Sequence, residues 1–101
     1  MVQSESNVDT AEKQLYVLRL YIADSERNSQ LARENLDGVC SEYLEGRCRI
    51  EEIDVLVDFE SALEDRIFVT PALILLDPGP RVVIVGNLAD RERVISALHL
   101  E

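Results

Sequence analysis

The sequence VTPALILL at residues 69–76 is followed by DPGP at residues 77–80 and by RVVIV at residues 81–85. The first run is apolar and predicts a buried strand, with Pro71 at its start, where a missing backbone donor is tolerated. The DPGP segment is a strong turn signal, and the second apolar run predicts the returning strand. Because a tight turn joins the two strands, we expect them to form an antiparallel hairpin.

Upstream of this hairpin, residues 15–23 (LYVLRLYIA) form an apolar run that predicts a strand buried on both faces, and therefore a central one. A helix is expected next, capped by Asn28 or Ser29 and ending near Gly46. Its apolar positions recur at spacings of three and four and are Ala32, Leu36, Val39, Cys40, Tyr43 and Leu44.

Residues 48–56 (CRIEEIDVL) predict a second strand. Its alternation breaks between Ile50 and Ile53, which indicates either a bulge or a change of exposed face. Asp58 can cap a short helix whose apolar face would hold Phe59, Ala62, Leu63 and Ile67. Residues 90–100 (DRERVISALHL) predict a final helix with an apolar face made of Val94, Ile95, Ala97 and Leu98.

The expected order of elements is therefore β-α-β-α-β-β-α, in one α/β domain spanning residues 15–101. The helix between the first two strands makes them parallel, with a right-handed crossover. Together with the hairpin this predicts a four-stranded mixed sheet with helices on both faces. Residues 1–14 carry few apolar side chains and are interpreted as a flexible tail.

Composition narrows the possible functions. The 101 residues carry a net charge of −10, which disfavours nucleic acid and anionic membrane surfaces as partners. No apolar run approaches the roughly 20 residues that span a bilayer, and the first residues lack the features of a secretory signal. A cytoplasmic protein is expected.

Cys40, Cys48 and His99 are too few to build a metal site of four Cys or His ligands from one chain, and no cofactor is expected. Both thiols are expected to be free and structural. Glu52 and Asp54 share one strand face, on which an acid and base pair is conceivable, but no histidine or phosphate loop converges there. A solvated surface is the favoured interpretation.

Several segments, taken in order, carry a resemblance to a known family. They are LRLYIA (18–23), NS (28–29), IDVL (53–56), TPAL (70–73) and GNLADRE (86–92). Together they resemble the KaiB family of cyanobacterial clock proteins, over nearly all of residues 15–100. The resemblance implies a thioredoxin-like fold, shared with the input domain of the clock kinase SasA.

The resemblance also implies a non-enzymatic function. KaiB proteins bind the clock ATPase KaiC, modulate its phosphorylation cycle and recruit further partners such as a sensor kinase or KaiA-like protein. Where thioredoxins carry their CxxC pair this chain has SERN (25–28), so redox catalysis is not expected. By analogy, the residues expected to contact a partner are Glu51, Ile53, Asp54, Phe59 and Ala62.

Family members can switch between a thioredoxin-like monomer and a tetramer of different fold. We expect this chain to rest as the monomer, with Pro71 in the cis form. Ala97 stands where the family often has Gly, and His99 where it often has an acid, and both changes favour the final helix. Ala89 would be a poor N-cap for that helix, and Asn87 is the alternative cap.

The second strand departs from the family. It carries Arg49, Glu51 and Glu52, where KaiB proteins often have apolar residues or lysine. Like charges across an interface are costly, so this departure puts binding to a standard KaiC in question. Two hypotheses follow: a module for a KaiC-like clock ATPase, or a paralogue outside the clock, in stress or signalling, with another partner.

Overall fold

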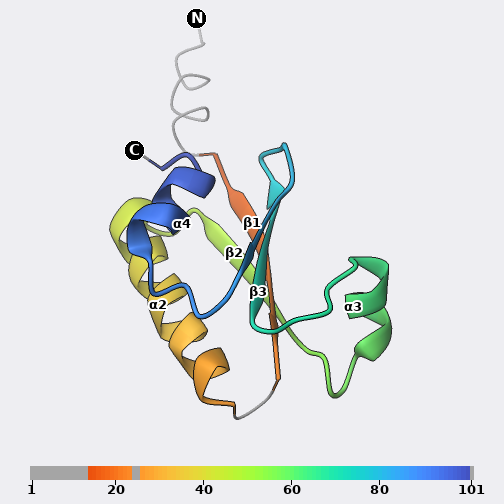
Figure 1. Ribbon diagram of the computed structural model, residues 1–101. Helices are drawn as coiled ribbons and strands as arrows, with labels where there is room; N and C mark the ends of the chain where they lie inside the picture. Colours follow the sequence, from red (N-terminus) through yellow and green to blue (C-terminus); the bar gives the residue numbers. More distant parts are fainter. Residues whose placement is uncertain (1–13, 24–25, 101) are drawn as a thin grey trace, which may run out of the picture.

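A computed structural model describes residues 14–23 and 26–100 of the chain (Figure 1). The elements in chain order are β1 (Tyr16–Ile22), α2 (Arg27–Tyr43), β2 (Cys48–Asp54), α3 (Phe59–Glu64), β3 (Ala72–Asp77), β4 (Val82–Val85) and α4 (Arg91–Ala97). This order is the one that the sequence predicts. The predicted flexible tail lies, except for Gln14, outside the described residues.

The strands form one mixed sheet in the order β2-β1-β3-β4. Strands β1 and β2 are parallel, with Tyr16 opposite Cys48 and Ile22 opposite Asp54. Strand β3 is antiparallel to both β1 and β4, so the predicted hairpin is present. Strand β1 is central, as its apolar sequence indicates.

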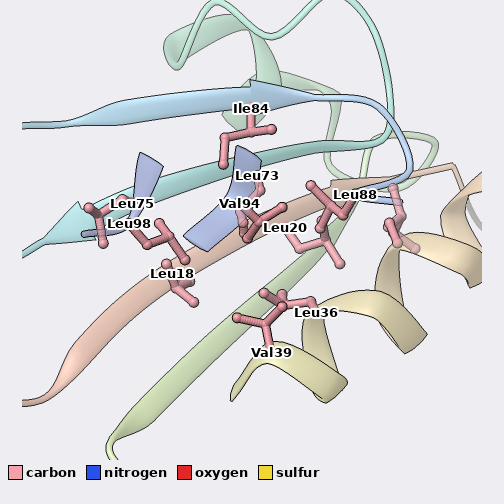
Figure 2. Packing of buried hydrophobic residues seen from close by; sticks show 12 residues of the cluster. Leu18, Leu20, Leu36, Val39, Leu73, Leu75, Ile84, Leu88, Val94 and Leu98 are labelled. Atoms are coloured by element: carbon pink, nitrogen blue, oxygen red, sulfur yellow. The ribbon is translucent and has the colours of Figure 1, made fainter. Parts of the chain in front are cut away.

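Helices cover both faces of the sheet, with α2 and α4 on one side and α3 on the other (Figure 1). Alternation along β1 divides the core between these faces. Leu18 and Leu20 point toward α2 and α4, where they meet Leu36, Val39 and Val94 (Figure 2). The smaller cluster under α3 consists of Tyr21, Ile53, Ala62, Ile67, Ala72 and Ile74.

Strand β2 contributes to both clusters. Cys48 and Ile50 pack against the larger cluster, whereas Ile53 belongs to the one under α3. The pairing of β2 with β1 runs without interruption, so the broken alternation reflects a change of exposed face and not a bulge. The register shift in the sheet lies instead between β1 and β3, at Val17 and Leu18.

The predicted cap of α2 is wrong. The N-cap is Glu26, and its side chain makes no capping hydrogen bond. Ser29 is buried, and its hydroxyl accepts a hydrogen bond of 3.0 Å from the backbone N–H of Ala23. The carboxamide oxygen of Asn28 accepts from Asn87 at 3.3 Å. Both side chains tie α2 to neighbouring segments and do not cap it.

Aspartate side chains cap the two short helices, α3 and α4. Asp58 accepts from the backbone N–H of Ser61 at 3.1 Å, which confirms it as the cap of α3. Helix α4 is capped by Asp90, which accepts from Arg93 at 3.2 Å.

Neither Ala89 nor Asn87 is therefore the cap of α4. The side-chain oxygen of Asn87 instead accepts from the N–H of Ala89 at 3.0 Å, within the preceding turn. The Thr70–Pro71 bond is cis, as predicted, and the bonds before Pro78 and Pro80 are cis as well. Within the described ranges, no helix is long and apolar enough to cross a membrane.

Candidate protein-binding surface

Large apolar side chains are exposed around α3. We call this set the α3 patch; it comprises Leu56, Val57, Phe59, Leu63, Phe68 and Val69. Val57 is 84% exposed, Phe68 77% and Phe59 62%. A group of large apolar side chains exposed in one region of a small protein usually marks an interaction site.

Local structure explains why these side chains face outward. Helix α3 has only six residues and buries only Ala62. The turn before it is held by Asp54, whose carboxylate accepts from the backbone N–H of Leu56 at 2.9 Å. The backbone N–H of Val57 donates to the carbonyl of Asp54 at 2.9 Å, which closes the turn. The turn presents Leu56 and Val57 beside the helix, where no other described element covers them.

The patch encloses an open depression of about 220 Å³. It is lined by Val55, Phe59, Ala62, Leu63, Ile67, Phe68 and Thr70. All but Thr70 are apolar, so the depression suits an apolar side chain of a partner. Exposed carboxylates flank it on α3 and its cap, at Asp58, Glu60 and Glu64, which favours a partner with a basic rim.

The structure separates the predicted contact residues into two groups. Glu51 and Phe59 are exposed and Asp54 is half-buried, so their side chains reach the surface. Ile53 is 9% exposed and Ala62 is 3% exposed, so both lie in the core under α3. In this conformation the buried pair supports the surface from below.

Acidic residues of β2 are held by ion pairs. The guanidinium of Arg19 donates to Glu51 at 2.8 Å, and that of Arg33 donates to Glu52 at 2.7 Å. Both pairs are substantially exposed, so their contribution to stability is small. They do fix the two carboxylates along the edge strand of the sheet.

A more buried polar network joins α3 to β1. Asp65, the C-cap of α3, accepts hydrogen bonds from the hydroxyl of Tyr21 at 2.6 Å and from Arg19 at 2.9 Å. The Tyr21 hydroxyl also lies 2.9 Å from the carbonyl oxygen of Ser61. Arg81 lies 3.3 Å from the second carboxylate oxygen of Asp65. The network therefore anchors the base of the α3 patch.

Electrostatics in this network keep Asp65 ionised. Burial alone would raise the pKa of Asp65, but hydrogen bonds from Tyr21 and Arg19, with the charges of Arg19 and Arg81, outweigh it and lower that pKa. Burial, followed by the hydrogen bond to Asp65, raises the pKa of Tyr21 to about 12. Both groups are thus held in the protonation states that bond to each other.

Sequence reasoning missed most of the α3 patch. Of the patch, only Phe59 was among the expected contact residues, whereas Val57, Phe68 and Val69 are similarly exposed. A signal was present, because apolar residues flank a helix too short to bury them all. The pattern alone could not show which of these apolar residues stay outside the core.

The two cysteines lie far from the usual place of a thioredoxin dithiol. Cys40 is in the last turn of α2 and Cys48 is the first residue of β2, whereas the CxxC position is at the start of α2. Among residues 14–23 and 26–100, no group of three or more His, Cys, Asp or Glu side chains could hold a metal ion.

The family model described as KaiB domain matches residues 19–100. The chain belongs to the KaiB family. The circadian clock oscillator protein KaiB of Nostoc punctiforme is 41% identical over 88 residues, which cover 87% of this chain and 85% of that protein. KaiB of Microcystis aeruginosa is 40% identical with the same coverage.

Solved structures agree with the fold. The N-terminal domain of SasA from Synechococcus elongatus superposes with a TM-score of 0.71 at 24% identity, covering 87% of each chain. Chloroplastic thioredoxin z gives a TM-score of 0.66 at 20% identity, covering 98% of each chain. At these identities the likeness establishes a thioredoxin-like fold, which the KaiB resemblance predicts.

Proposed function

We propose that this KaiB family chain is a non-enzymatic binding module for a KaiC-like clock ATPase, whose phosphorylation cycle it modulates. The curated relatives are circadian clock oscillator proteins, which supports a role in a clock. The observation that carries the proposal is the α3 patch beside the edge strand β2. A sensor kinase or a KaiA-like protein is the further partner that such a complex would recruit.

The patch has the composition of a binding centre. Aromatic side chains dominate the energetics of protein interfaces, and Phe59 and Phe68 are the most suitable anchors here. Both line the same depression, so one partner side chain inserted there would contact both rings. The flanking carboxylates would form the polar rim of the interface.

A titration of the purified chain with KaiC from the same organism tests the proposal. The double substitution F59A/F68A is expected to weaken binding at least tenfold, since truncating two anchors costs on the order of 2 kcal/mol or more. Both rings are exposed, so circular dichroism should show an unchanged fold.

Leu15→Ala is the matched control, because Leu15 is exposed before β1 and outside the patch. It should leave the affinity unchanged. Equal binding by F59A/F68A and the wild type would remove the α3 patch from the interface. Unchanged affinity after charge reversal at Glu51 and Asp54 would show that β2 is not part of the interface.

The second candidate is a KaiB paralogue outside the clock, acting as a stress or signalling adaptor. It is favoured by the ion-paired carboxylates of Glu51 and Glu52, which place fixed negative charge on the edge of the sheet. If the wild-type chain shows no association with its own organism's KaiC, this candidate replaces the first. Tight association would exclude it as the principal function.

A further inference from the structure

Two thiols meet where α2 ends and β2 begins. The sulfur atoms of Cys40 and Cys48 lie 2.8 Å apart, and both cysteines are free. Each is half-buried, and each packs partly against the larger core cluster. Because neither side chain is fully buried, a small reagent can reach the pair.

Backbone contacts with other residues hold Cys40 and Cys48 in place. The carbonyl of Cys40 accepts the N–H of Leu44 at 2.9 Å, and Cys48 pairs with Tyr16 in the parallel ladder. Between them the chain reverses at Gly46, whose φ of 80° suits glycine. A disulfide bond needs sulfur atoms about 2.03–2.05 Å apart, so closing it requires only a small further approach.

We propose that Cys40 and Cys48 form a reversible intramolecular disulfide when the protein reacts with a low-molecular-weight disulfide such as oxidised glutathione. The bond would connect the end of α2 to the edge strand β2. It constitutes a modification site separate from the α3 patch. The inference does not depend on which partner the patch binds.

The reaction is a double thiol–disulfide exchange. The thiolate of one cysteine attacks a sulfur of oxidised glutathione, forming a mixed disulfide and releasing one glutathione thiolate. The second cysteine then loses its proton, attacks the protein sulfur of the mixed disulfide and releases the second glutathione. Two electrons pass from the protein dithiol to glutathione, which is recovered as two thiols.

The contact between the sulfurs also prepares the first step. The hydrogen bond from Cys40 lowers the pKa of Cys48, although burial and the charge of Asp37 oppose this. The same hydrogen bond, with burial, raises the pKa of Cys40. Cys48 is therefore the attacking thiolate and Cys40 the resolving thiol.

The test is an equilibrium measurement on the full chain. The protein is incubated in buffers of varied ratio of oxidised to reduced glutathione, quenched with acid and alkylated. Peptide mass mapping then gives the fraction with Cys40 joined to Cys48. The same titration is repeated in concentrated urea, where the fold no longer holds the thiols together.

We expect the native chain to be half-bridged at a glutathione ratio at least tenfold more reducing than the unfolded chain. By linkage, the unfolding equilibrium constant of the oxidised protein should be smaller than that of the reduced protein by the same factor, as urea titrations would measure. Dithiothreitol should restore two free thiols. The single variants C40S and C48S should show no intramolecular bridge, and their remaining thiol should form only a mixed disulfide.

Three results would overturn the inference. One is a native chain that keeps two free thiols at a glutathione ratio at which the unfolded chain is already bridged. Another is a disulfide that forms only between two molecules. The third is equal midpoints for the native and unfolded chains, which would show that the fold does nothing to favour the bond.

Discussion

His99 occupies the first position after the cap of α4, with a φ of 57°. Its N–H donates to the carbonyl of Ser96 at 3.1 Å, and the N–H of Leu100 donates to that of Ile95 at 3.0 Å. These two bonds are the Schellman motif, in which the left-handed residue is usually glycine. Arg66, with a φ of 60°, ends α3 in the same way.

We therefore expect His99→Gly to stabilise the protein. The left-handed conformation costs an L-residue about 1–2 kcal/mol, which glycine avoids. Glycine also increases the conformational entropy of the unfolded chain, and this offsets part of the stabilisation. A net increase of roughly 0.5–1 kcal/mol in the free energy of unfolding should appear in urea titrations.

Ala97→Gly is the matched control, because it introduces the same residue two positions earlier, at the last helical residue of α4. It should lower the free energy of unfolding by up to about 1 kcal/mol. If both substitutions destabilise the protein, the left-handed ending of α4 is not the dominant effect at His99.

Single positions differ in how far the sequence could predict them. Asp58 was foreseen as a cap because an acid directly precedes a short apolar pattern, and local geometry was enough. His99 falls within the segment predicted as the final helix, but α4 ends at Ala97 and His99 is exposed just beyond its cap. Its left-handed backbone depends on where α4 stops, and that is set by the packing of Leu98 and Leu100 on the core.

Helix α3 is secured less by its own length than by Asp65. The helix has six residues, and Asp65 beyond it receives hydrogen bonds from Tyr21 and Arg19 of the central strand. Such short helices are marginal without tertiary contacts. This carboxylate therefore helps to anchor α3, together with the burial of Ala62 and the hydrogen bond from Tyr21 to the carbonyl of Ser61.

Asp65→Asn should lower the free energy of unfolding at neutral pH by roughly 1–3 kcal/mol, because it weakens bonds to charged and buried partners. Urea titrations measure this. Glu60→Gln, on the exposed side of the same helix, should change it by no more than about 0.5 kcal/mol. A neutral effect of Asp65→Asn would mean that α3 is anchored by apolar contacts alone.

The same carboxylate makes stability depend on pH. Its folded pKa is lowered, so its contribution is complete above the unfolded value of about 3.9 and is lost as the pH falls through the folded pKa. The acid limb of a plot of unfolding free energy against pH should therefore be shallower for Asp65→Asn than for the wild type. Parallel limbs would contradict this.

Among the secondary elements, periodicity predicted those whose sequence has a clear local apolar pattern. Strands β1 and β3 and helix α2 follow from apolar runs and spacings. The network of Tyr21, Arg19 and Asp65 was not foreseen, since it joins residues more than forty positions apart along the chain. Long-range polar contacts leave no periodic signal.

The thioredoxin-like arrangement of the described residues allows a test of the resting state of the protein. We expect NMR secondary shifts typical of a helix across Arg91–Ala97 and a single-chain mass in sedimentation equilibrium. Asp90, as the cap of α4, and Ala97 both favour this helix. Strand-like shifts there, together with a tetrameric mass, would show that the other fold of the family is the resting one.

The position of the dithiol bears on activity. We expect no insulin reduction above the background of a simple thiol, because the start of α2 lacks a cysteine at the described positions and the pair lies at the opposite end of that helix. Reduced glutathione at an equal thiol concentration gives this baseline. Catalytic turnover by the wild type over that baseline would make the protein an oxidoreductase.

The central place of β1 has a consequence for hydrogen exchange with solvent. Its two neighbours come from different parts of the fold: β2 ends the N-terminal half of the fold (residues 16–54), and β3 belongs to the C-terminal half of the fold (residues 59–97). The N–H of Tyr16 donates toward the β2 side, to Arg47, and donors alternate along a strand, so Leu20 donates toward β2 and Tyr21 toward β3. An opening confined to the C-terminal half would release the amide of Tyr21 and leave that of Leu20 protected. Adjacent amides of one strand thus report separately on the two halves of the protein.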